Sequence, residues 1–313
     1  MPGAANAKTY GIALARRFLD RLASQSNRTL RSPGVAEVHD LRVAIRRFTQ
    51  VLLVFKPCFP AKEIKRVHRA LKKTMALAGE ARDLDIALGF LAKSRLKEAA
   101  RLLADFQSRR KEAGRILTDK LQDWAKRRIS SKWRRKLLAA SANPGAADLA
   151  TIEDATKETL PRLVKRFFAL GNQTAGGARH SEQLHQLRIA AKKLRYTLEL
   201  LGPPRESALG GRLDQLKKLQ AILGSVNDAE LVRTMVLRED AARRLSDELA
   251  RRRDQKIDEF ESFWKTEVAG DGSLGRWRKD LTGVSQKRHV PSKPPARSES
   301  AMRPAPKSNL SAN

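Results

Sequence analysis

The residues best suited to chemistry are a histidine and a row of cations that occur twice along the chain. The first copy is HDLRVAIRRFTQVLLVF, residues 39–55, and the second is HQLRIAAKKLRYTLELL, residues 185–201. The matching positions are His39 and His185, Arg42 and Arg188, Arg46 and Lys192, and Arg47 and Lys193. Positions i, i+3 and i+7 share one face of an α-helix, so each copy presents a cationic stripe without a carboxylate. Such a stripe is suited to binding an anion.

A solvated basic face is the alternative interpretation of any single stripe. Like charges three or four residues apart destabilise an isolated helix, and here the arrangement recurs with histidine in register. The repetition therefore favours an anion-binding surface. His39 and His185 have a second interpretation, as structural histidines where helices meet.

The elements that must position these stripes are amphipathic helices. Leu41, Ile45, Phe48 and Leu52 lie opposite the first stripe, and neither copy contains glycine or proline. The same periodicity predicts helices over residues 8–25, 35–56, 61–78, 82–93, 95–140 with a break near Ser130-Ser131, 152–170, 185–201 and 209–223. The expected fold class is all-α.

A second repeated segment follows each stripe. LKKTMALAGEARDLD, residues 71–85, matches LKKLQAILGSVNDAE, residues 216–230. Gly79 and Gly224 are expected to end helices, and Arg82-Asp83 and Asn227-Asp228 to begin the next ones as capping residues. Further cations accompany this segment, namely Lys65, Arg69, Lys72, Lys73, Lys217 and Lys218. Two elements repeated in the same order indicate an internal duplication into two pseudo-symmetric helical bundles.

The predicted organisation is one duplicated unit followed by a tail. The halves are expected at about residues 6–142 and 146–283, separated by Asn143-Pro144-Gly145. Residues 284–313 are rich in proline, serine and cations and are expected to be disordered.

The charge of the chain restricts its partners. The 64 lysines and arginines outnumber 34 acidic residues, which gives a net charge of +30 and favours a polyanionic partner. A single cysteine, Cys58, excludes an internal disulfide. No apolar run is long enough to span a membrane. The first residues contain arginines where a secretory signal is apolar, so a cytoplasmic location is expected.

The paired HDLRVAIRRF and HQLRIAAKKLRY segments, each followed by GEARDLD or GSVNDAE, resemble the CHAD family, named for a conserved histidine α-helical domain. The similarity covers roughly residues 6–283 and implies two four-helix bundles around a basic central cavity. It also implies binding of inorganic polyphosphate and association with polyphosphate granules. The motif positions implied to bind the ligand are His39, Arg42, Arg46, Arg47, His185, Arg188, Lys192, Lys193 and Arg195.

The chain departs from the family pattern in places. Thr49 stands opposite Arg195, and two lysines replace the first half's arginines, which reduces forked hydrogen bonding to phosphate in the second half. The E-x-E-x-K strand of the triphosphate-tunnel domain that many family members carry is not found, so a stand-alone member is expected.

Other functions have weaker support. There is no Walker A or H-E-x-x-H motif and no carboxylate pair suited to Mg²⁺, so no catalytic residue, metal site or cofactor is expected and the chain is not expected to be an enzyme. The main alternative is nonspecific binding of DNA or RNA, which the net charge favours. Aromatics are only 5% of residues and do not interleave the stripes, unlike single-strand binders. Membrane-surface binding would require Trp or Phe opposite the charges.

Overall fold

The structure is a computed structural model that describes residues 7–139, 159–177, 180–200, 208–237, 242–270 and 272–286. These residues form helices and short connections, which confirms the all-α fold class. The first helices are α1 Ala7–Arg31, α2 Val35–Val54, the short 3₁₀ helix η1 Lys56–Cys58, α3 Ala61–Leu91, α4 Lys97–Lys126 and α5 Ile129–Ala139. The later ones are α7 Thr159–Ala175, α8 Ser181–Leu200, α9 Ala208–Val236, α10 Arg243–Phe263, the π-helical turn η3 Trp264–Val268 and α11 Ser273–Gln286.

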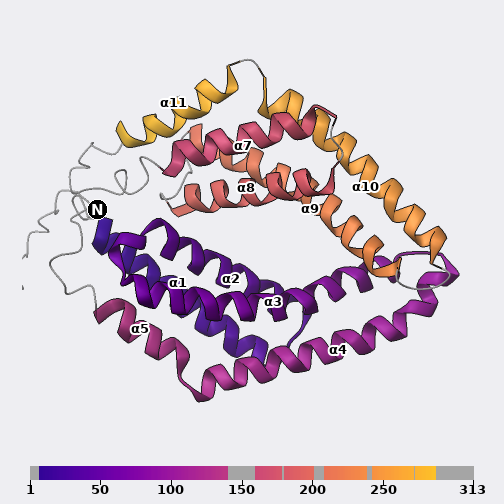
Figure 1. Cartoon of the computed structure of the whole chain (residues 1–313), viewed down its shortest axis with the longest axis horizontal. Helices are drawn as coiled ribbons and strands as arrows, with labels where there is room; N and C mark the ends of the chain where they lie inside the picture. Colours follow the sequence, from indigo (N-terminus) through magenta and orange to yellow (C-terminus); the bar gives the residue numbers. More distant parts are fainter. Residues whose placement is uncertain are drawn as a thin grey trace, which may run out of the picture.

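The helices form two groups that meet along α2, α3, α8 and α9 (Figure 1). One apolar core lies among α1–α5 and the other among α7–α11. The carboxyl end of α9 and the start of α10 cross over, and their Val232, Val236, Leu245 and Leu249 belong to the first core. The two groups are therefore joined by shared apolar packing as well as by the α2–α8 contact.

The predicted ends of two helices at glycine are wrong. Helix α3 continues through Gly79 to Leu91, and α9 continues through Gly224 to Val236. A glycine inside a helix costs roughly 1 kcal/mol relative to alanine, so Gly79 needs another explanation. A β-carbon added there would lie 2.8 Å from Nη1 of Arg42, so glycine leaves room for a guanidinium from α2.

Other predicted boundaries also shift. The break near Ser130-Ser131 lies earlier, at Arg127 and Arg128, where Arg128 has a φ of 49°. The helix predicted to stop before Gly171 continues to Ala175, and the Trp264 ring packs so closely on Gly171 that a β-carbon would not fit there. Helix α11 reaches Gln286, three residues into the segment predicted to be disordered. The remainder of that segment, the predicted boundary at 143–145 and residues 152–158 lie outside the described residues.

Candidate functional site

The two stripes identified in the sequence lie on helices α2 and α8, which pack against each other. Each helix turns its leucines and phenylalanines into its own core, so the polar stripes are left at the contact between the groups. The carboxyl ends of the two helices are joined by a hydrogen bond from Nε2 of Gln50 to Oγ1 of Thr197 at 3.0 Å. The ion pair between Arg47 and Glu199, at 3.7 Å, reinforces this junction.

Beyond that junction the contact becomes strongly cationic. We call this region the cationic seam and define it by His39, Arg42 and Arg46 of α2, Arg82 of α3, and Arg188 and Lys192 of α8. Their charges influence one another across the two halves: Arg188 lowers the pKa of Arg42, and Arg46 lowers the pKa of Arg188. Residues far apart in the sequence therefore form one electrostatic unit.

The pKa values of the seam cations are lowered, because nearby carboxylates compensate only part of the positive charge. Burial, followed by repulsion from Arg188, Arg46 and Arg42, lowers the pKa of Lys192 to about 7. Burial and Arg46 lower the pKa of Arg42 to about 10. The pKa of His39 is lowered by burial and by Arg82, so without a ligand this imidazole favours its neutral form. Within the described part of the chain, Arg46, Arg188 and Lys192 make no ion pair at 4.0 Å or less.

Besides Asp40, which raises the pKa of His39, two carboxylates act on the seam cations, and these are Asp83 of α3 and Asp228 of α9. Both were expected to cap helices, and this is wrong, because α3 and α9 run through them without interruption. Burial raises the pKa of both, against the opposing effects of Arg42 on Asp83 and of Arg188 on Asp228. They act as internal counter-charges that offset part of the repulsion among the seam cations.

Sequence reasoning missed Arg82, Asp83 and Asp228 as components of the site. A usable signal was present, because Lys72, Gly79 and Asp83 are spaced by seven and four residues and share a helix face. The corresponding Lys217, Gly224 and Asp228 have the same spacing in α9. Because Gly79 and Gly224 were each interpreted as the end of a helix, these residues were not recognised as lying on one continuous helix face.

The other predicted site residues fall into three groups. Arg47 and Arg195 both pair with Glu199, at 3.7 and 3.5 Å, and so contribute to the junction. Lys65, Arg69 and Lys72 are exposed on the α3 face that leads to Asp83, whereas Lys217 on the equivalent face of α9 pairs with Asp214 at 2.8 Å. The remaining exposed residues are Lys73, Lys193 and Lys218.

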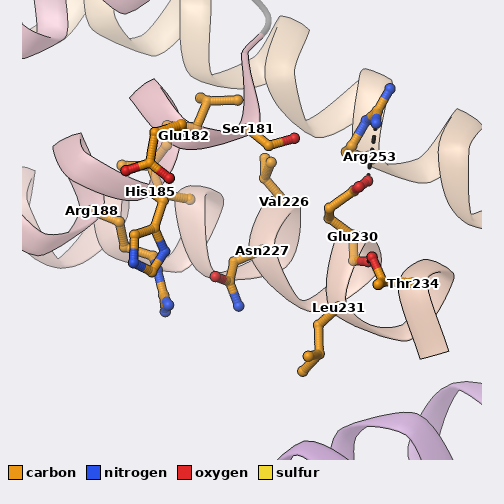
Figure 2. Close-up of a pocket in the computed structure, with 12 residues that line it drawn as sticks. Ser181, Glu182, His185, Arg188, Val226, Asn227, Glu230, Leu231, Thr234 and Arg253 are labelled. Carbon is orange, nitrogen blue, oxygen red and sulfur yellow. Dashed lines mark hydrogen bonds and ion pairs between the residues drawn. The ribbon is translucent and has the colours of Figure 1, made fainter.

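His185 lies outside the seam as defined and lines a neighbouring cavity of about 370 Å³, together with Arg188 (Figure 2). The described residues contain no group of three or more His, Cys, Asp or Glu side chains arranged to hold a metal ion. None of the described helices has the length and apolar character needed to cross a membrane.

The unusual pKa of Lys192 leads to a stability prediction. Its pKa is lower in the folded than in the unfolded chain, so the charged form of Lys192 lowers the free energy of unfolding. This destabilisation has its full size below pH 7 and decreases as the pH rises from 7 to the unfolded pKa of about 10.5. Lys192→Met is expected to raise the Tm of the ligand-free protein at pH 7 by a few degrees, since about 1 kcal/mol shifts the Tm of a large domain by roughly 2–4 °C. Differential scanning calorimetry in phosphate-free buffer measures this. Lys193→Met, at the exposed neighbour, is the control, and an unchanged or lowered Tm for Lys192→Met would contradict the interpretation.

Comparison with known proteins places this arrangement in a family. The chain is 26% identical over 236 residues to the uncharacterized proteins MT2285 and Rv2226 of two Mycobacterium tuberculosis strains, an alignment covering 69% of this chain and 43% of the relatives. It therefore spans less than half the length of these curated relatives.

Two solved structures share the fold. The crystal structure of the CHAD domain from the plant Ricinus communis aligns with a TM-score of 0.63 and 18% identity, covering 90% of this chain and 93% of that one. PptA from Streptomyces chartreusis aligns with a TM-score of 0.53 and 16% identity, covering 90% of this chain and 100% of that one. The family model of the CHAD domain matches residues 13–237, and the chain therefore belongs to the CHAD family.

Proposed function

We propose that the chain binds inorganic polyphosphate in the cationic seam. The observation that carries this proposal is the set of partly buried cations that α2, α3 and α8 bring together, with Asp40, Asp83 and Asp228 as the counter-charges that act on them among the described residues. Such a cluster raises the free energy of the empty protein, and a polyanion relieves that cost when it binds. Membership of a family associated with polyphosphate supports the choice of ligand.

Polyphosphate suits this geometry because it is a thin chain of closely spaced anionic oxygens without bases. Arginine offers forked hydrogen bonds to phosphate and lysine a compact charge, and both are present here. The exposed Lys65, Arg69 and Lys72 continue the cationic surface along α3, so a long chain can leave the seam over that helix. A role in targeting to polyphosphate granules is part of the same proposal.

The direct test is a titration of the purified protein with long-chain polyphosphate at increasing salt. Binding is expected at low ionic strength and should weaken steeply with salt, because several cations act together and are screened together. We propose binding without turnover, so the same mixtures should release no orthophosphate, with or without Mg²⁺ or Mn²⁺. A lack of binding even at low salt would refute the proposal.

A competition assay separates this function from nonspecific nucleic-acid binding. Duplex DNA is a wide rod with one charge per roughly 1.7 Å of axis, so it can reach exposed cations more easily than a seam between packed helices. Polyphosphate is therefore expected to displace DNA at equal phosphate concentration. Deleting residues 287–313, which contain six lysines and arginines and one glutamate, should weaken DNA binding more than polyphosphate binding. If DNA displaces polyphosphate from both the full chain and the truncated protein, nucleic acid is the better ligand.

A further inference from the structure

A cavity of about 370 Å³ adjoins the cationic seam on the side of α8, α9 and α10 (Figure 2). This volume is within the roughly 300–1,000 Å³ of sites for small organic ligands. Leu184, Leu223 and Val226 supply apolar walls, and Asn227 supplies an amide that can both donate and accept hydrogen bonds. Of the twelve lining residues, four are apolar and eight are polar or charged, so the cavity suits an organic group that has both apolar faces and hydrogen-bonding edges.

Two of the charged residues that line this cavity, Glu230 and Arg253, are paired with each other. Glu230 accepts hydrogen bonds from Arg233 at 2.8 and 2.9 Å, and from Arg253 at 3.0 Å. Glu230 of α9 and Arg253 of α10, which face each other in the lining, therefore compensate each other's charge. This side of the cavity therefore suits an uncharged group, whereas Glu182 and Arg188 carry charge on the opposite side (Figure 2).

Arg188 joins the two regions, because it is a seam cation and also lines the cavity. Its Nε is buried and makes no hydrogen bond to any described residue. His185 and Arg188 of α8 and Asn227 of α9 all line the cavity and are drawn on the side of Figure 2 away from Glu230 and Arg253. A ligand with phosphates on Arg188 and Lys192 could extend an attached organic group past Asn227 into the cavity.

We propose that this cavity is a nucleoside subsite, so that the protein binds nucleoside oligophosphates with their phosphates in the cationic seam and their base between Leu184, Leu223 and Val226. A nucleobase has apolar faces for such walls and a polar edge for the Asn227 amide. The inference rests on the proposed function, because the seam must hold the phosphates.

The test compares ATP with tripolyphosphate, which has a similar phosphate chain without the nucleoside, by isothermal titration calorimetry without divalent cations. ATP is expected to bind at least tenfold more tightly. Thr234→Trp places a bulky ring at the exposed rim of the cavity and should abolish this advantage while leaving tripolyphosphate binding within twofold.

A matched control is Thr266→Trp. Both threonines are exposed and donate their hydroxyl to the carbonyl four residues earlier, at 2.9 Å for Thr234 and 3.0 Å for Thr266, but Thr266 does not line the cavity. It should retain the preference for ATP. If tripolyphosphate binds and ATP has no advantage, or if Thr234→Trp leaves the advantage intact, the nucleoside subsite is wrong. If neither ligand nor long-chain polyphosphate binds, the proposed function itself fails.

Discussion

The double substitution Arg46→Gln and Lys192→Gln is expected to weaken polyphosphate binding by about 10²–10⁴-fold. Hydrogen bonds to charged groups contribute roughly 1.5–3 kcal/mol each, and 1.4 kcal/mol corresponds to a factor of ten in affinity. Both side chains lie in the seam without an ion-pair partner among the described residues, so removing them leaves no carboxylate uncompensated at short range. Fluorescence anisotropy with labelled polyphosphate measures the loss, and circular dichroism checks that the helices remain.

The control removes the same charge elsewhere. Arg101 and Lys111 are exposed on α4, outside the seam, so their double replacement by glutamine should change affinity by only about threefold through screened long-range attraction. Equal losses in the two double variants would mean that binding follows net charge alone and that the seam is not the site.

The contribution of each half can be separated with the same assay. Replacing Arg42 and Arg46, or Arg188 and Lys192, should weaken binding in both cases, because the seam is built from both halves. The first pair is expected to matter more, because it consists of arginines and Lys192 is only partly charged at pH 7. Wild-type affinity in either variant would contradict a shared site.

Polyphosphate binding is also expected to depend on pH through Lys192. Its pKa of about 7 in the empty protein is set by burial and by Arg188, Arg46 and Arg42, with Asp228 acting in the opposite direction. A bound polyanion favours the charged form, so above pH 7 binding requires uptake of a proton. Affinity for long-chain polyphosphate should therefore fall from pH 7 to pH 9, by up to about tenfold per pH unit.

Lys192→Arg isolates this effect. Arginine stays charged throughout this range, and arginine already occupies the matching position in the first half, Arg46. The variant should bind with a flat profile between pH 7 and 9, whereas Lys193→Arg at the exposed neighbour should keep the wild-type slope. Proton uptake can be measured directly by calorimetry in buffers of different ionisation enthalpy. A flat wild-type profile, or an unchanged slope in Lys192→Arg, would exclude Lys192 as the titrating group.

Local sequence pattern was sufficient for the fold class and for α2 and α8, two of the three helices that carry the seam. Apolar residues at helical spacing require α2 and α8 to bury one face, and this leaves His39, Arg42, Arg188 and Lys192 on the other. The chemistry of the stripe could therefore be predicted, because it depends on residue type and periodicity alone.

The ends of α3 and the role of its acidic residue could not be predicted in the same way. Glycine is a common helix terminator when judged from its neighbours in sequence, but Gly79 lies inside α3, where its missing side chain leaves room for Arg42 of another helix. The identity of Asp83 as a counter-charge follows from that continuity. The approach of Arg42 to Gly79 is a contact between two helices, and local helix propensity contains no information about such a contact.

The sequence by itself determined that the chain is all-helical, strongly basic and equipped with two matching cationic stripes. Only the tertiary structure decided which cations share a site. Glu199 takes up Arg47 and Arg195, whereas Arg46 and Lys192 are left to repel each other beside Arg42 and Arg188. The physical reason is that burial and Coulomb interaction depend on distances across packed helices, and these distances are set by the cores of both groups rather than by any one segment.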